Sequence, residues 1–283
     1  MRTIEHVDEM QCVSLDLRRR GGRIAFVPTM GFLHEGHLSL MRAARSRAEV
    51  VVVSIFVNPT QFGPGEDVRS YPRNLERDRK LCEGERVDIL FCPADGEMYQ
   101  RTHSVYVEET ELSHGLCGAL RPGHFRGVAT VVAKLFNIVQ PHVAVFGQKD
   151  AQQVRIIRQM VADLNFAIEI VAAPTVREPD GLAMSSRNAR LSSSERVEAL
   201  CLMQSLQRAA QAYRDGERDA GKIREAMAEV IGRARQARVD YIEIVDPDTL
   251  RPLSVINGTA LATLAVRIGD TRLIDNLILG PPV

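Results

Sequence analysis

Up to about residue 175, the chain alternates short apolar runs of strand length with longer segments in which apolar residues recur at helical spacing. This alternation is typical of βα units arranged around a parallel sheet. Most of the runs are almost continuously apolar, as expected for strands that helices cover on both faces. The predicted strands are 23–27, 50–57, 88–91, 142–146 and 167–172, and the predicted helices between them include 38–48, 128–139 and 151–163.

The pattern changes after Pro174, where a polar stretch at 177–181 leads into a Ser-rich segment. Beyond it the pattern predicts two amphipathic helices and then three strands, at about 194–214, 220–237, 240–245, 260–266 and 271–279. This arrangement is an α+β module. We therefore expect an α/β fold, with a larger parallel-sheet domain over residues 1–175 and a smaller α+β domain over residues 176–283.

Composition excludes several classes of protein. The chain has 283 residues, of which 45% are apolar, so it can bury a substantial core. Its 36 Lys and Arg balance its 36 Asp and Glu, which argues against binding to nucleic acid or to a membrane surface through bulk charge. The longest apolar run, 50–57, is far shorter than the ~20 residues that span a bilayer. Because the N-terminus lacks a signal-peptide layout and the five cysteines form no CxxC pair, we expect a cytoplasmic protein without disulfides or structural zinc.

A first candidate site follows the first predicted strand, at residues 27–37. Ligands of open α/β sheets bind at the carboxyl ends of strands, and helix N-termini favour anions. His34 and His37 would bring two imidazoles to a phosphate there, and Gly36 would allow close backbone approach. Taken alone, an HxxH spacing is better explained by two histidines that cap a helix. A metal site is less favoured, because the spacing differs from that of the zincin helix and no third ligand is evident.

A second candidate segment, at residues 54–62, ends a strand in Asn58 and Gln61. Carboxamides can orient a hydroxylated or carboxylated small molecule without adding charge. An ordinary Asn-Pro turn explains the segment equally well. Downstream, Asp78 lies on a predicted polar helix; it could be a magnesium ligand, although a solvated helix charge is the simpler interpretation.

Two further segments carry polar groups suited to phosphates. At 146–153 a strand again leads into a helix, and Lys149 could neutralise charge that develops in phosphoryl or nucleotidyl transfer. The alternative there is a polar loop in which Asp150 caps the helix. Met184 to Arg187 offer two hydroxyls and a guanidinium at the domain boundary. The joint placement of the four segments favours a nucleotide site, although neither a P-loop nor a GxGxxG sequence is present.

Together these segments resemble the pantoate–β-alanine ligase (pantothenate synthetase) family over nearly the whole chain. The resemblance is carried by PTMGFLHEGH at 28–37, SIFVNPTQF at 54–62, RPGHFRGV at 121–128, FGQKDAQQ at 146–153 and REPDGLAMSSRN at 177–188. The His34-Glu35-Gly36-His37 segment is similar to the HxGH signature of the nucleotidyltransferase superfamily. The resemblance implies a Rossmann-like nucleotidyltransferase domain and a smaller C-terminal α+β domain that acts as a lid.

The resemblance also implies a reaction. ATP and (R)-pantoate would react with Mg²⁺ to give a pantoyl adenylate and diphosphate, and the amine of β-alanine would then displace AMP to give pantothenate. A carboxylate needs this activation because its own oxygen is a poor leaving group. Adenylation removes the need for a covalent enzyme nucleophile, which suits a sequence in which no Ser-His-Asp or Cys-His signature stands out.

Residue roles follow from the resemblance, position by position. His37, His34 and Lys149 are the expected catalytic residues, with His37 as proton donor. Pantoate is expected at Gln61, Gln153 and Asn58, with β-alanine close to Gln61, and Asp78 is the expected aid to Mg²⁺. The expected ATP-binding residues are Met30, Gly31, Phe32, Leu33, His34, Glu35, Gly36, His37, Gly147, Gln148, Lys149, Asp150, Val176, Met184, Ser185, Ser186 and Arg187.

Two alternatives use the same segments. One is a simple nucleotidyltransferase that makes a stable nucleotide-linked product, and the other is a nucleotide-binding module without enzymatic activity. The family resemblance also suggests a homodimer, with small-molecule substrates and neither nucleic-acid nor membrane partners. The sequence departs from the family pattern at Gln148, where Glu is found in related sequences, and at Thr60, where Met is familiar.

Overall fold

The computed structural model describes residues 1–66, 68 and 70–280. The chain forms two compact units that interleave along the sequence. The first unit consists of Met1–Ser113, Arg121–Gln148 and Gln153–Pro174, and the second consists of His114–Leu120, Lys149–Gln152 and Thr175–Val283.

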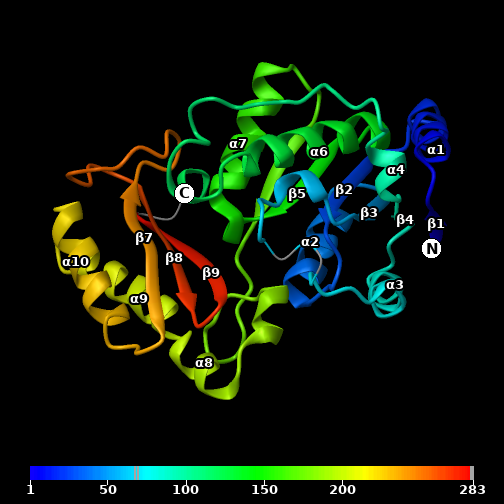
Figure 1. Ribbon diagram of the computed structural model, residues 1–283. Helices are drawn as coiled ribbons and strands as arrows, with labels where there is room; N and C mark the ends of the chain where they lie inside the picture. The colour runs from blue at the N-terminus through cyan, green and yellow to red at the C-terminus, as the bar shows by residue number, and fades with distance from the viewer. Residues whose placement is uncertain (67, 69, 281–283) are drawn as a thin grey trace. The chain divides into compact units, whose positions relative to one another are not determined.

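The first unit is built on a six-stranded parallel sheet with the strand order β1-β4-β3-β2-β5-β6 (Figure 1). Its strands are β1 (Arg2–Ile4), β2 (Ile24–Thr29), β3 (Val50–Ile55), β4 (Ile89–Phe91), β5 (Val143–Gly147) and β6 (Glu169–Ala173). The longer helices that follow or flank these strands are α1 (Val7–Arg19), α2 (Glu35–Arg45), α3 (Leu75–Gly84), α6 (His124–Val139) and α7 (Ala151–Asp163). Short elements are η1 (Pro59–Gln61), α4 (Asp95–Met98) and η2 (Gln148–Asp150).

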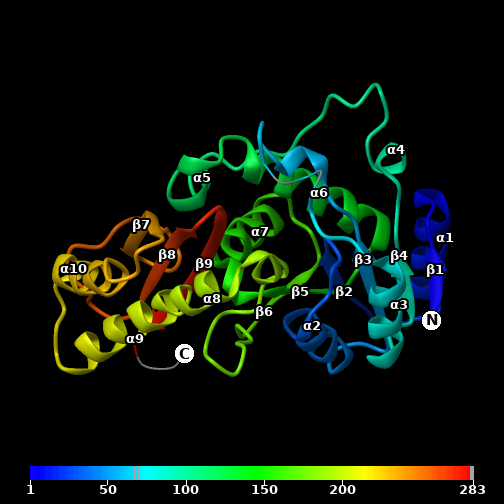
Figure 2. The ribbon, with the colours of Figure 1, turned by 60° about the horizontal axis from the view of Figure 1, so that its bottom comes forward.

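Both faces of this sheet are buried, which explains the continuous apolar runs. Alternate residues of β2 and β3 pack with the apolar positions of α2 in one core cluster, as Val27 and Val53 do. Helix α6 covers the other face of the sheet (Figure 2). On that side the rings of Phe136 of α6 and Phe146 of β5 are 6.5 Å apart. The central position of β2 and β3 places the turns that follow them in the middle of the carboxyl edge of the sheet.

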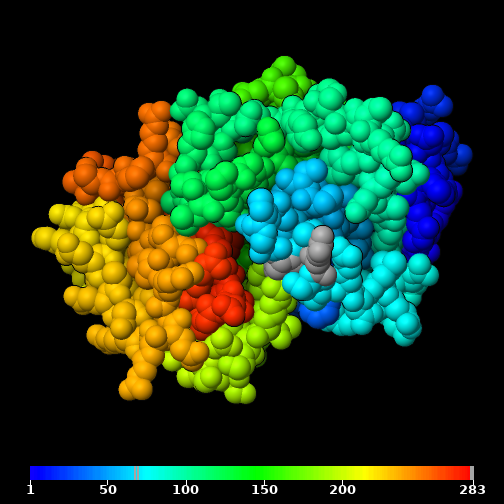
Figure 3. Space-filling view, in the orientation of Figure 1, coloured from blue at the N-terminus to red at the C-terminus, as the bar shows by residue number. Residues whose placement is uncertain are grey.

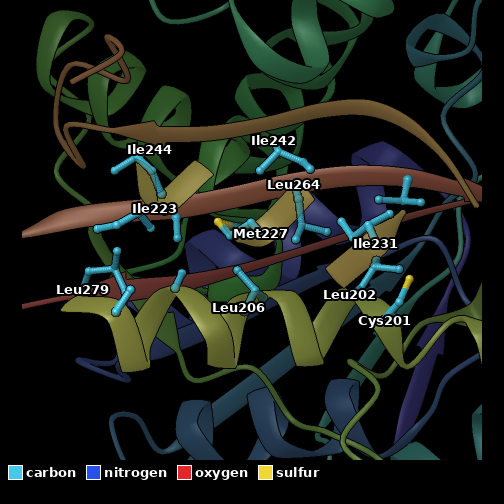
Figure 4. Close-up of a cluster of buried hydrophobic side chains, with 14 of the residues drawn as sticks. Cys201, Leu202, Leu206, Ile223, Met227, Ile231, Ile242, Ile244, Leu264 and Leu279 are labelled. Atoms are coloured by element: carbon cyan, nitrogen blue, oxygen red, sulfur yellow. The ribbon is translucent and has the colours of Figure 1, made fainter. Parts of the chain in front are cut away.

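The second unit contains a three-stranded antiparallel sheet in the order β7-β8-β9. Its elements are α5 (Leu116–Leu120), η3 (Ser186–Arg190), α8 (Ser193–Glu198), α9 (Cys201–Arg214), α10 (Ala220–Ile231), β7 (Ala237–Val245), β8 (Ala260–Ile268) and β9 (Thr271–Leu279). The apolar stripes of α9 and α10 cover one face of this sheet, with Leu206 and Met227 among the fully buried side chains (Figure 4). A separate core of this kind is what an independently packed α+β unit requires.

The predicted fold class is confirmed, and several element boundaries are corrected. The helix predicted at 194–214 is two helices, α8 and α9, with a turn at Ala199-Leu200. The helix predicted at 220–237 ends at Ile231, and Ala237 instead begins β7, because its backbone pairs with Ile268. The N-terminal β1 and α1 were not predicted. β1 is only three residues long, whereas α1 carries a readable signal, because Val7, Met10, Val13 and Leu17 recur at helical spacing.

The helices of the described residues include no candidate for a membrane-spanning segment. None of them is both long enough and apolar enough to cross a bilayer.

Candidate active site

The turn between β2 and α2 has an unusual backbone. Gly31 and Phe32 both adopt positive φ, at 81° and 50°. A Cβ at Gly31 would lie 2.9 Å from a methyl carbon of Ile55, so both space and conformation require glycine there. This turn carries the chain from the end of β2 to His34 at the start of α2.

Asp78 of α3 fixes this turn. Its two carboxylate oxygens accept hydrogen bonds from the backbone N–H groups of Phe32, at 2.7 Å, and Leu33, at 2.8 Å. Its neighbour Arg77 donates to the carbonyl of Leu33 at 2.9 Å. Asp78 is only 1% exposed, so its interpretation as a solvated helix charge is wrong. The burial could not be foreseen, because α3 is polar at nearly every other position and its buried contacts come from a turn 45 residues away.

His34 and His37 lie together at the N-terminus of α2. Their ring centroids are 4.1 Å apart, and the backbone N–H of His34 donates to Nδ1 of His37 at 3.3 Å. The two histidines therefore form a capping arrangement, as the simpler interpretation expected. Because a backbone N–H can only donate, Nδ1 of His37 is the acceptor, and the neutral ring carries its proton on Nε2. Capping thus leaves His37 with a defined N–H donor at an anion-favouring helix end.

The segment after β3 presents Asn58 and Gln61 in different ways. Asn58 caps η1 and is 1% exposed. Its Oδ1 accepts from the hydroxyl of Tyr99, and its Nδ2 donates to Oε1 of Gln61 and to the carbonyl of Gly127. Gln61 is 8% exposed, and its Nε2 lies 3.3 Å from the sulfur of Met30. Residues 62–66, which follow in light blue, reach the surface of the first unit (Figure 3). Gln61 is thus the group that faces the β2 turn, and Asn58 stands behind it.

Behind this segment, the backbone carbonyl of Gln61 is held as well. It accepts from Nδ1 of His124 at 2.8 Å and from Arg121 at 3.4 Å. Arg121 in turn forms a bidentate pair with Glu66, with N–O distances of 2.7 and 2.6 Å. Burial opposes the ionisation of Glu66, but the hydrogen bonds from Arg121 outweigh this, so the pKa of Glu66 lies below its ordinary value. The 121–128 segment therefore supports the Gln61 loop.

The segment after β5 divides between the two units. Gly147, Gln148 and the half-buried Gln153 belong to the first unit, whereas Lys149 and Asp150 belong to the second. The Lys149 side chain is 19% exposed, and its Nζ lies 3.8 Å from a carboxylate oxygen of Asp150. The carbonyl of Lys149 accepts a hydrogen bond from Nδ2 of Asn276 on β9 at 2.9 Å.

The segment at residues 176–184 forms a small hairpin in the second unit. Met184 donates to the carbonyl of Val176 at 3.0 Å, so these two predicted ATP-binding residues lie side by side. Gly181, with φ at 98°, makes the turn. Arg177 ties the hairpin to β9 through a bidentate pair with Asp275, at 2.6 and 3.0 Å. Ser185 follows as the cap of η3, which contains Ser186 and Arg187.

Among the predicted residues, the structure brings together two sets. One comprises Met30 to His37 with Gln61, Asn58 and Asp78 in the first unit, and the other comprises Val176 with Met184 to Arg187 in the second. Sequence reasoning missed the groups that hold the site segments, namely Thr60 and Tyr99 at Asn58, Arg177 and Asp275 at the hairpin, and Asn276 at Lys149. Arg177 was visible as part of REPDG, but its partner on β9 is 98 residues away.

Comparisons with known proteins cover nearly the whole chain. The family described as "Pantoate-beta-alanine ligase" matches residues 2–278. A pantothenate synthetase of Thermotoga petrophila is 58% identical over 280 residues, which are 99% of this chain and 100% of that protein. The pantothenate synthetase of Geobacter sulfurreducens is 54% identical over 280 residues, 99% of each chain.

Solved structures agree with the sequence matches. A crystal structure of pantothenate synthetase from Thermus thermophilus has a TM-score of 0.95 and 47% identity, covering 99% of this chain and 100% of that one. A pantoate-beta-alanine ligase from Francisella tularensis, complexed with "Beta-gamma ATP and Beta-alanine", has a TM-score of 0.82 and 34% identity, with coverage of 98% and 97%.

Proposed function

This chain belongs to the pantoate–β-alanine ligase family, and from that premise we propose that it condenses (R)-pantoate with β-alanine through a pantoyl adenylate, with release of diphosphate and AMP. The observation that carries this function is the match over residues 2–278, which includes the polar segments of both units. The product is pantothenate, the precursor that coenzyme A biosynthesis consumes.

The chemistry assigns a task to each set of residues. Met30 to His37 would line the ATP site, with His34 and His37 at the phosphates and the Nε2 proton of His37 available to the developing negative charge. Lys149 would stabilise charge on the phosphates in the transition state, with Gly147, Gln148 and Asp150 around it. Val176 would contact the nucleoside through its backbone, and Met184, Ser185, Ser186 and Arg187 would close over the triphosphate.

Pantoate would be held by neutral amides. Gln61 and Gln153 would hydrogen-bond the acid, which they can do without adding a charge that competes with the phosphates. β-Alanine would bind beside Gln61, with its amine directed at the acyl carbon. For Asn58 we propose an indirect role through Gln61, because its buried amide is already bonded to protein partners.

The described residues do not fit a magnesium centre held by the protein alone. They contain no cluster of three or more His, Cys, Asp or Glu side chains that could hold a metal. Asp78 is 1% exposed and its two oxygens accept backbone N–H groups of the β2 turn, so its carboxylate serves that turn rather than an open metal site. We propose instead that Mg²⁺ binds through the phosphates of ATP, as this ion often does.

Three further properties are part of the proposal. The second unit would act as a lid that excludes water from the adenylate, so ATP should protect the 174–190 segment from protease. Two copies would form a homodimer, which sedimentation velocity would detect. The enzyme would work in the cytoplasm, where the five free cysteines of the structure stay reduced.

The deciding experiment follows AMP formation by the purified chain with ATP, Mg²⁺, pantoate and β-alanine. AMP that depends on both pantoate and β-alanine supports the ligase. Appearance of ADP would contradict the adenylate route. Steady diphosphate release that does not respond to β-alanine would favour a nucleotidyltransferase, and ATP binding without turnover would favour a binding module.

A further inference from the structure

We propose that Tyr99 and Thr60 are positioning residues that fix the orientation of the Gln61 amide through Asn58, and so make Gln61 a hydrogen-bond donor to pantoate. This inference rests on the proposed function and adds two residues that do not themselves contact substrate. All four side chains belong to the first unit.

The chain of contacts begins at Oδ1 of Asn58. Three donors converge on this atom, namely the hydroxyl of Tyr99 at 2.8 Å, the hydroxyl of Thr60 at 2.9 Å and the backbone N–H of Thr60 at 3.3 Å. The backbone N–H of Thr60 can only donate and the carbonyl of Gly127 can only accept, so these two groups decide which way the Asn58 amide faces. In that orientation both hydroxyls donate to Oδ1 and stabilise it further. Nδ2 must then lie on the opposite side, where it donates to Oε1 of Gln61 at 3.0 Å and to the carbonyl of Gly127 at 3.1 Å.

The orientation passes to Gln61 by the same logic. Since Oε1 of Gln61 accepts from Asn58, the Nε2 group is the one directed at the β2 turn, where it lies 3.3 Å from the sulfur of Met30. A thioether is a weak acceptor. A carboxylate or hydroxyl oxygen of pantoate accepts more strongly and would replace it. If the Asn58 amide had the opposite orientation, its oxygen would accept from Nε2 of Gln61. Gln61 would then direct its own oxygen at the carboxylate of pantoate and repel it.

Tyr99 is well placed to act as a permanent donor. Its ring packs against Phe56 and His103, at centroid distances of 6.2 and 4.9 Å, and the ammonium of Lys134 lies 5.5 Å from its centre. Burial raises the pKa of the Tyr99 hydroxyl, which therefore keeps its proton at neutral pH. The neutral hydroxyl can donate to Asn58 throughout the working range.

Gly127 completes the arrangement by allowing close approach. A Cβ on this residue would lie 2.4 Å from the carbonyl oxygen of Thr60, so α6 could not pack on η1 with any other residue there. The approach brings the Gly127 carbonyl to Asn58, which gives Nδ2 its second acceptor. With the Asn58 side chain buried and bonded at both ends, its amide has no alternative orientation of comparable energy.

The test uses four variants of the full chain after wild-type turnover has been established. Tyr99→Phe removes one hydroxyl, Thr60→Val removes the other, the double variant removes both, and Asn58→Asp replaces the Nδ2 donor by an acceptor. Tyr106→Phe is the matched control, because Tyr106 is 44% exposed and packs on His103, so the variant removes a nearby hydroxyl that does not bond to Asn58. Steady-state constants are measured separately for pantoate, ATP and β-alanine, and folding is followed by circular dichroism.

We expect each single hydroxyl deletion to raise the KM for pantoate roughly three- to tenfold, with a larger rise in the double variant. Asn58→Asp should cause the largest rise, on the order of a hundredfold, because Gln61 must then turn its oxygen toward pantoate. The KM for ATP and the thermal midpoint of Tyr99→Phe should stay close to the wild-type values, which a merely structural role of the hydroxyl would not predict.

The outcomes separate this inference from the function on which it rests. Lack of AMP formation by the wild type would remove both. Normal wild-type turnover combined with an unchanged pantoate KM in the double variant would remove the positioning role and leave the ligase intact. An equal rise in the KM for ATP and pantoate would also count against it, since the contacts end at the pantoate-facing amide.

Discussion

The two units hold their site segments in different ways. In the first unit the segments follow directly from parallel strands, and each has its own anchor: the Asp78 carboxylate accepts from two N–H groups of the β2 turn, and Asn58 orients Gln61. In the second unit the segments lie outside strands, and β9 holds both. Asp275 pairs with Arg177 of the hairpin, and the next residue, Asn276, binds the carbonyl of Lys149.

This difference has a mechanical consequence. In the first unit, separate anchors support the histidines and Gln61, so one can be disturbed without the other. In the second unit, adjacent residues of one strand support both Lys149 and the 176–184 hairpin. A disturbance of β9 should therefore affect together the group that we propose stabilises phosphate charge and the segment that we propose covers the nucleotide.

The largest effect is expected from Lys149→Ala. Removal of one transition-state donor typically lowers turnover by about 10²- to 10³-fold. The KM for ATP should change little, because the residue acts mainly on charge that develops during reaction. Lys80→Ala, which removes an exposed lysine of α3, is the control and should leave turnover unchanged. Turnover of Lys149→Ala within a few-fold of wild type would take Lys149 out of the mechanism.

A slightly smaller effect is expected from Asp275→Asn. Asp275 is 1% exposed and Arg177 is its bidentate partner, so the substitution leaves a guanidinium without its carboxylate. Removal of one partner of a buried pair costs about 3 kcal/mol or more. Unfolding by urea, read with hydrogen exchange of the β9 amides, measures this loss. Asp270→Asn, in the exposed turn between β8 and β9, is the control, and equal midpoints for the two variants would contradict the anchoring role.

The same contrast explains what the sequence could predict. Continuous apolar runs such as 50–57 identify strands buried on both faces, and the polar segments that follow them locate the carboxyl edge of the sheet. The anchors escape prediction because their partners are distant in sequence: Asp78 and Leu33 are 45 residues apart, and Asn276 and Lys149 are 127 apart. Nothing local distinguishes the buried Asp78 from exposed acids on the same polar helix.

Domain membership escapes prediction for a similar reason. Residues 114–120 and 149–152 stand inside the first 175 residues but pack with the second unit. For Cys117 the cause is visible, since its backbone N–H donates to Gln152 and its sulfur lies 3.3 Å from the hydroxyl of Tyr241 on β7. Hydrophobic periodicity records which face of a helix is buried, but it does not record which sheet covers it.

A third prediction tests the anchor of the first unit. Asp78→Asn loses a charge-assisted acceptor and turns an N–H group toward one of the two backbone donors, so the stability of the first unit should fall by about 2 kcal/mol. The catalytic efficiency with ATP should fall as the β2 turn loosens, while hydrogen exchange at the 176–184 hairpin should stay unchanged. Glu83→Gln, an exposed position on the same helix, supplies the control. Loosening of the hairpin as well would mean that the anchors of the two units are not independent.

The smallest effect is expected in the pH dependence of stability that the Arg121–Glu66 pair of the first unit confers. The carboxylate of this pair is 28% exposed, whereas that of the Arg177–Asp275 pair in the second unit is 1% exposed. The folded-state pKa of Glu66 lies below its ordinary value of 4.5, so the unfolded chain binds the proton more readily. The stabilisation is therefore fully present above about pH 4.5 and is lost as the pH falls through the folded-state pKa. Because the Glu66 side chain is 28% exposed, we expect a contribution of at most about 1 kcal/mol.

The difference in unfolding free energy between wild type and Glu66→Gln should shrink as the pH is lowered from 6 to 3. The corresponding difference for Glu76→Gln, which removes an 83% exposed carboxylate, should stay near zero. A Glu66→Gln difference that is constant over this range would show that the pair with Arg121 does not stabilise the loop that carries Gln61.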